Sequence, residues 1–274
     1  MAEAFLHYDQ VASSYDQPRH HFFYGHLAEK LCILAKEHVQ PESILDVGCG
    51  TGISTVEIIK HFPGAEVTAL DRSPSMLELA RKKEDIRTVT FCYGQTKDLP
   101  VSETRFDLII ANMSYHWLFP GDRRALRDAL KENGVLVMSF PLIMPFPKKE
   151  GNSLLLTIFR RLKEMQPAWH PFRGTRGLNW NEVVKSLPGL VPIRFKRYCM
   201  EERFRRASDF LEVLRVRGVF FGFFGNKAAA AENIARALLQ EGEAISYAWP
   251  IGIAIFRREG PQKKQKTGQK QPED

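Results

Sequence analysis

Short apolar runs alternate with longer amphipathic segments over the first half of the chain. Five runs have the length and composition of buried strands, at 43–47, 66–70, 87–93, 106–111 and 135–140. Four segments carry apolar residues at helical spacing, at 18–37, 53–61, 75–82 and 122–131. Strands that alternate with helices in this order predict an α/β fold, with a parallel sheet covered by helices on both faces.

The pattern changes after Phe140. A proline-rich run at 141–147 interrupts regular structure. The segments that follow predict further helices at 154–165, 181–187, 208–216 and 227–241. Two more segments predict extended structure, at 191–198 and 245–256. The second half therefore adds two late strands and several helices to the first.

Length and composition favour one compact domain. The 274 residues are 44% hydrophobic, which suffices for a large core, and α/β folds of this size often form a single unit. No apolar run is long enough to span a bilayer, and the first residues lack the basic-then-apolar layout of a secretory signal. We expect a cytoplasmic protein with no membrane association.

Charge and cysteine usage add two expectations. The formal net charge is +7, and residues 257–274 hold six basic side chains against three acidic ones with almost nothing apolar. Such a segment cannot offset its ordering entropy by burial, so we expect a disordered basic tail, which either attracts acidic partners or only aids solubility. The four cysteines are scattered and no histidine spacing suggests zinc, so we expect neither disulfides nor a metal site.

The most informative local pattern is the run Leu-Asp-Val-Gly-Cys-Gly-Thr-Gly that ends the first predicted strand. Its glycines, Gly48, Gly50 and Gly52, let the backbone turn sharply and approach a ligand without interference from Cβ atoms. The dinucleotide fingerprint needs a glycine where Ile53 stands, and Asp46 would lie close to a pyrophosphate. The run therefore disfavours NAD and favours a cationic ligand.

A second signal, about 20 residues beyond the glycines, is Asp71 at the end of the second strand, where a carboxylate can accept hydrogen bonds from two ribose hydroxyls. The turn, this carboxylate and the helix start at 73–77 resemble the cofactor motifs of the class I S-adenosylmethionine-dependent methyltransferases. The resemblance implies S-adenosyl-L-methionine as the cofactor. It also implies a Rossmann-like, seven-stranded methyltransferase sheet with helical lid insertions.

On this resemblance we expect a single methyltransferase domain over residues 1–256, followed by the tail. Its expected parts are an N-terminal arm and helix at 1–40, a cofactor-binding core at 41–140, a helical lid with one strand at 141–244, and a final strand at 245–256.

The family's adenine-binding Asp is replaced here by Gln95, whose amide oxygen is a neutral and weaker acceptor. The N-terminal arm resembles the family's segment that closes over the cofactor, where Tyr8 and Tyr15 could exclude water; ordinary helix packing explains these aromatics equally well. The expected cofactor residues are Tyr8, Tyr15, Asp46, Gly48, Cys49, Gly50, Gly52, Asp71, Arg72, Met76, Gln95, Thr96 and Asn112.

Residues 112–117 follow the fourth predicted strand, where the family's transferable methyl group points. No Pro-Pro follows Asn112, which argues against methylation of nucleic acid bases, and no basic and aromatic stripe suggests a nucleic acid partner. His116 could act as a general base, or it could simply pack under the lid. Tyr15 is a second candidate for a catalytic role, and Trp117 is a candidate wall of the substrate pocket.

Two later segments, at 207–218 and 245–257, resemble the malonyl-acyl-carrier-protein O-methyltransferases of biotin biosynthesis. The resemblance implies an acidic carrier protein as partner. Residues 194–217 hold eight basic side chains against four acidic ones, which would steer such a partner unless they are only a solvated face. A malonyl carboxylate needs neither deprotonation nor a metal. Candidates to hold it in a two-pronged contact are Arg173, Arg176, Arg215 and Arg217.

Two alternatives stay open at this point. The acceptor could be another small metabolite, such as a tricarboxylate or a natural-product hydroxyl. The chain could also be a methyltransferase-like scaffold that binds the cofactor poorly and acts through protein contacts. Gln95 favours the scaffold, whereas the intact glycines, Asp46 and Asp71 argue against it. The sequence gives neither the acceptor atom nor the oligomeric state.

Overall fold

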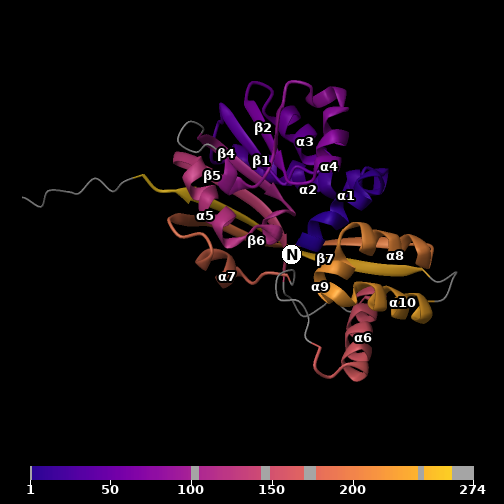
Figure 1. Cartoon of the computed structure of the whole chain (residues 1–274). Helices are drawn as coiled ribbons and strands as arrows, with labels where there is room; N and C mark the ends of the chain where they lie inside the picture. The colour runs from indigo at the N-terminus through magenta and orange to yellow at the C-terminus, as the bar shows by residue number, and fades with distance from the viewer. Residues whose placement is uncertain (1, 100–104, 143–148, 170–176, 240–243, 261–274) are drawn as a thin grey trace, which may run out of the picture.

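The computed structural model describes residues 2–99, 105–142, 149–169, 177–239 and 244–260. Within them, seven strands form one sheet in the order β3-β2-β1-β4-β5-β7-β6 (Figure 1). The strands are β1 Ser43–Val47, β2 Glu66–Asp71, β3 Thr90–Tyr93, β4 Phe106–Asn112, β5 Leu130–Pro141, β6 Leu190–Phe204 and β7 Ile245–Arg258. The expected α/β fold and seven-stranded sheet are confirmed.

The sheet has a parallel part and an antiparallel part. Strands β1 to β5 pair in parallel, as the alternation of strands and helices predicts. Strand β7 runs antiparallel to both β5 and β6. The antiparallel pairing of β6 with β7 is visible at their connected ends, where Phe204 at the end of β6 pairs with Ile245 at the start of β7. The chain therefore turns back at the same end of the pair.

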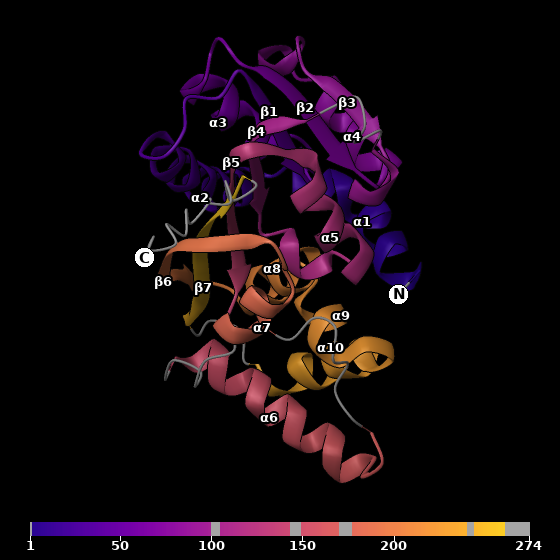
Figure 2. The ribbon, with the colours of Figure 1, turned by 90° about the vertical axis from the view of Figure 1, so that its left-hand side faces the viewer.

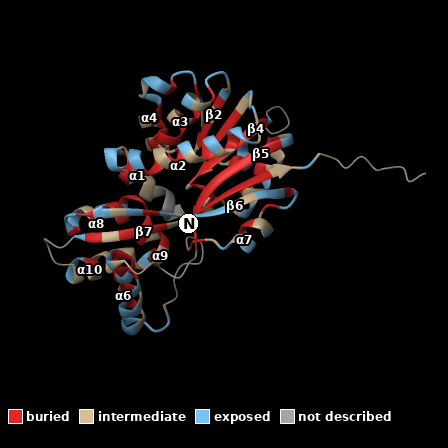
Figure 3. Ribbon diagram, turned by 180° about the vertical axis from the view of Figure 1, so that it is seen from behind, coloured by how far each residue is buried: buried red, intermediate tan, exposed pale blue. Residues whose placement is uncertain are grey.

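Helices cover both faces of the sheet, as Figure 3 shows by the buried strands beneath them. Helices α2, α3 and α4 share an apolar cluster with one face, whereas α5 and α7 pack on the other. The helices are α1 Ala2–Tyr15, α2 Pro18–Lys36, α3 Ile53–His61, α4 Pro74–Arg81, α5 Pro120–Ala129, α6 Glu150–Met165, α7 Trp180–Lys185, α8 Ala207–Val216, α9 Val219–Phe224 and α10 Ala228–Leu238. No helix in the described ranges is long and apolar enough to cross a membrane.

Strands β6 and β7 form a two-stranded ribbon that continues beyond the rest of the sheet. Strand β6 pairs with β7 from Ile245 to Arg258, whereas β5 pairs with β7 only from Ile251 to Arg257. The outer end of the ribbon carries α6, α8, α9 and α10, here called the helical layer (Figures 1 and 2). The molecule thus consists of a core around β1 to β5 and a ribbon with its helical layer.

Several boundaries differ from those that the sequence pattern predicts. Strand β6 is longer than expected, and the aromatic helix α9 was not expected at all. Strand β7 includes Arg257 and Arg258, which were assigned to the tail. The Arg258 guanidinium donates to the carbonyl oxygens of Arg127 and Leu130, and these bonds hold the strand end in the sheet. Residues 261–274 of the expected tail and most of the proline-rich run lie outside the described residues.

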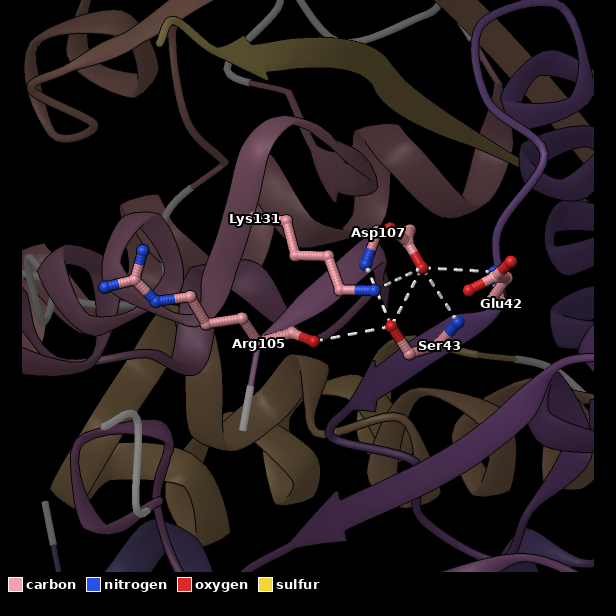
Figure 4. Close-up of polar contacts among 5 residues, drawn as sticks. All are labelled: Glu42, Ser43, Arg105, Asp107 and Lys131. Atoms are coloured by element: carbon pink, nitrogen blue, oxygen red, sulfur yellow. Dashed lines mark hydrogen bonds and ion pairs between the residues drawn. The ribbon is translucent and has the colours of Figure 1, made fainter. Parts of the chain in front are cut away.

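A polar cluster fixes the register of β1 and β4 at their amino ends (Figure 4). Asp107 Oδ2 accepts hydrogen bonds from the backbone N–H groups of Glu42 and Ser43, at 3.1 and 3.0 Å, and from the Lys131 ammonium at 3.0 Å. Burial would raise the pKa of Asp107, but Lys131 and Ser43 outweigh it and lower that pKa. The opposite, carboxyl edge of these strands is left for a ligand.

Candidate active site

A cavity opens at the carboxyl ends of β1, β2 and β4, beside the glycine turn. It encloses about 940 Å³, counted with the space at its mouth. Twelve of the residues expected to bind cofactor or substrate line it: Tyr8, Tyr15, Gly48, Cys49, Gly50, Asp71, Arg72, Met76, Gln95, Thr96, Asn112 and Trp117. The structure therefore brings residues from separate sequence motifs into one site.

The glycine turn links β1 to α3. Gly50 has a φ of +56°, and a Cβ added there would meet no atom within 4 Å, so this glycine borders open space. Gly52 has a φ of +83°, and its Cβ would lie 2.6 Å from Ile86 Cδ1. One glycine thus leaves room beside the cavity, whereas the other lets α3 pack closely. Gly52 lies outside the lining of the cavity.

Asp71 ties the end of β2 to the glycine turn. Its Oδ2 accepts a hydrogen bond from Gly50 N at 2.7 Å, and its Oδ1 accepts one from Ser73 N at 2.9 Å. Burial raises the pKa of Asp71, and the backbone N–H groups partly counteract this. Each carboxylate oxygen can accept more than one hydrogen bond. The held carboxylate therefore remains able to accept from ligand hydroxyl groups.

Asp46 is buried in β1 and does not itself line the cavity. Its Oδ2 accepts from Thr55 Oγ1 at 2.7 Å, whereas its Oδ1 has no partner. Burial raises the pKa of Asp46 to about 7, the Thr55 hydroxyl lowers it and nearby Asp71 raises it further. A buried carboxylate with an unpartnered oxygen would be stabilised by a cationic group, reached directly or through water.

Gln95 lines the cavity together with two buried polar side chains, Thr96 and Asp122. Thr96 Oγ1 is buried and has no hydrogen-bond partner. Asp122, at the start of α5, accepts from the backbone N–H groups of Lys97 and Phe119 at 3.3 and 3.2 Å. Because Asp122 also lines the cavity, a carboxylate is present there although Gln95 replaces the expected one.

Aromatic side chains form a wall that encloses the cavity, here called the aromatic wall: Tyr8, Tyr15, Tyr24 and Trp117. Tyr15 stacks on Tyr24 with ring centroids 5.0 Å apart, and Tyr8 packs edge-on against Trp117 at 5.6 Å. Burial raises the pKa of all three tyrosines. Their hydroxyls therefore stay protonated at physiological pH, and since Tyr15 and Tyr24 hydrogen-bond to each other, Tyr8 and one of that pair can donate to a ligand.

Helix α1 is fixed over the cavity by two carboxylates. Asp9 accepts from Ser73 Oγ at 2.5 Å, at the N-cap of α4. Asp16 accepts from Thr51 Oγ1 at 2.9 Å, within the glycine turn, and from Lys83 Nζ at 2.7 Å. The N-terminal arm is therefore bonded to the two segments that also position Asp71.

Asn112 and Met113 end β4 at the cavity. The Asn112 amide nitrogen donates to Tyr24 O and Ser54 Oγ, at 2.9 and 2.8 Å, so both of its hydrogens are used within the protein. Met113 has a φ of +52°, a left-handed conformation that is costly for a non-glycine residue. Asn112 thus braces the wall, and the strained Met113 turn lies where the chain leaves the sheet.

His116 does not line the cavity. Burial and the charge of Arg123 lower its pKa to about 3, which leaves it a weak base at neutral pH. The thiol of Cys49 lies at the cavity, but burial and the nearby carboxylates raise its pKa well above the usual value. The geometry therefore gives neither side chain the environment of a general base or nucleophile.

The arginines proposed to hold a substrate carboxylate are not placed for that role. Arg217 is buried, and its guanidinium is bound through both terminal nitrogens by Glu202. Arg215 is exposed and does not line the cavity. Arg173 and Arg176 lie outside the described residues. A guanidinium already held by a carboxylate has no free fork for a second one.

Comparison with known proteins identifies the family. A family described as methyltransferase domain matches residues 44–134. A malonyl-[acyl-carrier protein] O-methyltransferase of Hahella chejuensis is 33% identical over 250 residues, which cover 85% of this chain and 82% of that protein. The chain belongs to the class I S-adenosylmethionine-dependent methyltransferases.

Two further relatives show how far similarity defines the methyltransferase's reaction. A malonyl-[acyl-carrier protein] O-methyltransferase of Acetivibrio thermocellus is 30% identical, over 78% of this chain and 76% of its own. A rice 2-methyl-6-phytyl-1,4-hydroquinone methyltransferase is 32% identical, over 64% of this chain and 55% of its own. Relatives of comparable identity thus carry names with different acceptors, so the chain is a methyltransferase whose acceptor needs a separate argument.

Solved structures confirm the methyltransferase fold. The YcgJ protein of Bacillus subtilis superposes with a TM-score of 0.56 at 18% identity, over 86% of this chain and all of that one. The [4+2]-cyclase SpnF superposes with a TM-score of 0.53 at 16% identity, over 85% of this chain and 82% of that one. Because a cyclase shares the fold, the fold alone does not define the reaction.

The cavity of this methyltransferase fits S-adenosylmethionine, its cofactor. The open space at Gly50 leaves room for a ligand, and Asp71 can accept from a ribose. The unpartnered oxygens of Asp46 and Thr96 are polar groups that a ligand could satisfy. We propose that Asp71 holds the sugar, Asp46 the cationic amino acid end and Thr96 the adenine.

Among the cavity-lining residues that sequence reasoning missed are Tyr24, Ser114 and Asp122. Ser114 packs against Gly48, where an added Cβ would lie 2.5 Å from the Ser114 Cβ. Tyr24 lies on the buried face of a helix, and Asp122 is an ordinary acidic residue in a first helical turn. None of the three carries a motif, so no sequence signal singles them out.

Proposed function

We propose that this enzyme transfers a methyl group to the free carboxylate of a malonyl group carried by an acyl carrier protein. Relatives that match most of the chain bear this activity in their names. The observation that carries the proposal is the chemistry of the cavity lining. Among the described residues that line it there is no histidine and no lysine, and burial raises the pKa of its tyrosines and its cysteine.

This lining suits an acceptor that is already nucleophilic. A carboxylate is ionised at neutral pH, whereas a phenol or an alcohol needs a base to remove its proton. The cofactor, when bound, supplies a methyl group activated on a sulfonium. The protein then has to exclude water and hold the acceptor oxygen in line, because positioning alone can account for a large part of the acceleration.

The residues of the aromatic wall supply these functions. Tyr8 and Tyr15 both come from α1, which Asp9 and Asp16 fix over the cavity. The Tyr15 and Tyr24 hydroxyls hydrogen-bond to each other, so Tyr8 and one of that pair can donate hydrogen bonds to a carboxylate without adding a charge to the site. Neutral donors orient an anion while leaving it nucleophilic, which an arginine pair would do less well.

An acidic carrier protein would meet basic side chains on the ribbon and α8. Exposed basic residues in this region are Lys196, Arg197, Arg203, Arg205 and Arg215. Clustered charge of one sign raises the rate at which a partner of opposite charge associates. We therefore assign this basic face to the carrier.

The test is methyl transfer from labelled S-adenosylmethionine to malonyl-carrier protein. Acetyl-carrier protein, which lacks the free carboxylate, is the matched control, and free malonate, a tricarboxylate and a phenolic acceptor are run beside it. We expect transfer to the malonyl carrier alone. Efficient transfer to the phenol or to the free acids, with none to the malonyl carrier, would refute the proposal and favour a small-metabolite acceptor.

A further inference from the structure

A buried charged cluster joins the ribbon to the aromatic wall. Arg217, at the C-cap of α8, exposes 2% of its side chain and forms an ion pair with Glu202 of β6, which exposes 10%. The same carboxylate accepts a hydrogen bond from Trp249 Nε1 of β7 at 2.6 Å. The guanidinium lies over the rings of Phe23 and Trp249, 3.9 and 4.8 Å from their centroids.

The cluster reaches the cavity through His20. Arg217 Nε donates to His20 Nδ1 at 3.2 Å, which requires His20 to be neutral with its proton on Nε2. Burial, with the charge of Arg217, lowers the pKa of His20 to about 3, in agreement with this form. The His20 ring stacks on Tyr15, with centroids 5.6 Å apart and planes 10° apart.

Gly218, the residue after Arg217, makes a second contact with the aromatic wall. Gly218 has a φ of +72°, and a Cβ at this position would lie 2.9 Å from the Tyr8 hydroxyl and 3.5 Å from Trp117. The end of α8 therefore touches the aromatic wall directly at Tyr8 and Trp117, and through His20 at Tyr15. Both contacts depend on where Arg217 holds the helix end.

Stability alone does not account for such a cluster. Replacing a buried ion pair with apolar side chains of similar volume is often neutral or stabilising. The guanidinium instead orients its neighbour, because its planar donors fix one tautomer and one orientation of the His20 ring. We propose that Arg217 is a positioning residue for the aromatic wall, and that its pair with Glu202 couples the ribbon to the cofactor cavity. This role holds for any methyl acceptor.

The double variant Arg217→Leu with Glu202→Gln tests the proposal, because it removes both charges together and keeps an acceptor for Trp249. Binding of S-adenosylhomocysteine is measured by calorimetry on the full chain, which needs no acceptor. The matched control is Arg194→Leu, which removes an arginine of β6, the strand of Glu202, whose partner Glu37 is exposed. We expect the dissociation constant to rise about tenfold or more in the double variant, and to stay unchanged in the control.

Two further measurements separate positioning from packing. Nitrogen NMR of labelled histidine should show one His20 tautomer in the parent and a mixture in the double variant. Arg217→Lys keeps the charge but loses the planar fork, so it should weaken S-adenosylhomocysteine binding as well. A folded double variant that binds as tightly as the parent overturns the proposal. So does unfolding of every Arg217 variant at the assay temperature, which would make the cluster a stability element.

Discussion

The core and the ribbon build the active site in different ways. In the core, the contacts that shape the cavity join residues close in sequence, such as Gly50 and Asp71, which are 21 positions apart. In the ribbon, the decisive contact joins Arg217 to His20, 197 positions away. Local strand and turn geometry places the first contact, whereas the second exists only after the whole sheet has assembled. Cofactor binding should therefore depend most on the core and, through Arg217, to a smaller extent on the ribbon, whereas acceptor docking should depend on the exposed side chains of the ribbon.

The largest expected effect is a loss of cofactor affinity that distinguishes Asp71 from Asp107, two carboxylates of the core. Asp71→Ala removes the acceptor of two backbone N–H groups beside the cavity, and we expect S-adenosylhomocysteine to bind about a hundredfold less tightly, from the loss of charged hydrogen bonds. The control is Asp107→Ala at the opposite edge, which holds a comparable set of backbone N–H groups. It should cost about 2 kcal/mol of stability and leave affinity unchanged. Equal affinity losses in calorimetry would contradict this division.

The second prediction concerns the pH dependence of cofactor binding. The pKa of Asp46 is raised to about 7, and a bound cationic group would favour its ionised form. Binding then releases a proton below that pH, so affinity should fall about tenfold for each pH unit of acidification and level off on the alkaline side. Asp46→Asn should bind more weakly and independently of pH. Calorimetry between about pH 5.5 and 8 measures this dependence. If the affinity of Asp46→Asn changes with pH as steeply as that of the parent, Asp46 is not the cause of the pH dependence.

The third prediction moves to the ribbon. Arg203→Glu with Arg205→Glu reverses two exposed charges of the basic face. We expect kcat/KM for malonyl-carrier protein to fall about tenfold at low salt, because association slows, with less effect at high salt. S-adenosylhomocysteine binding and transfer to a small malonyl thioester should not change. If the small thioester loses as much activity as the carrier, the charges act inside the site and not in docking.

The smallest expected effect comes from an exposed ion pair between the ribbon and the core. Arg194 lies within 2.6 Å of Glu37, and both side chains are partly exposed. Such pairs contribute little, so Arg194→Leu should change the free energy of unfolding by less than about 1 kcal/mol. Urea denaturation provides the measurement. A much larger loss would show that the ribbon is fixed to the core by charge and not by its apolar face.

The sequence predicted the core more accurately than the ribbon, for a physical reason. The helix at 53–61 and the strand at 43–47 were located correctly because apolar periodicity and the glycine turn are local signals. Helix α9 was missed, since a six-residue aromatic segment has no period long enough to read. Strand β6 was predicted too short because its exposed basic positions conceal the pairing with β7.

The same distinction applies to the site residues. The glycines, Asp71, Gln95 and Thr96 line the cavity or border it, as their spacing predicts. Arg217 was proposed to bind substrate, yet it is held by Glu202, and His116 was proposed as a base, yet it lies outside the lining. A side chain's charge is visible in sequence, whereas its partner is not.

The sequence by itself determined the fold class, the family and the cofactor. These depend on short motifs whose geometry follows from neighbouring backbone, and the chain carries them between 43 and 100. Only the tertiary structure decided which carboxylates are buried, which arginine is paired and which tyrosines enclose the cavity. Burial and pairing arise from contacts between distant segments, and those contacts set the pKa of each group and the donors it has left for a ligand.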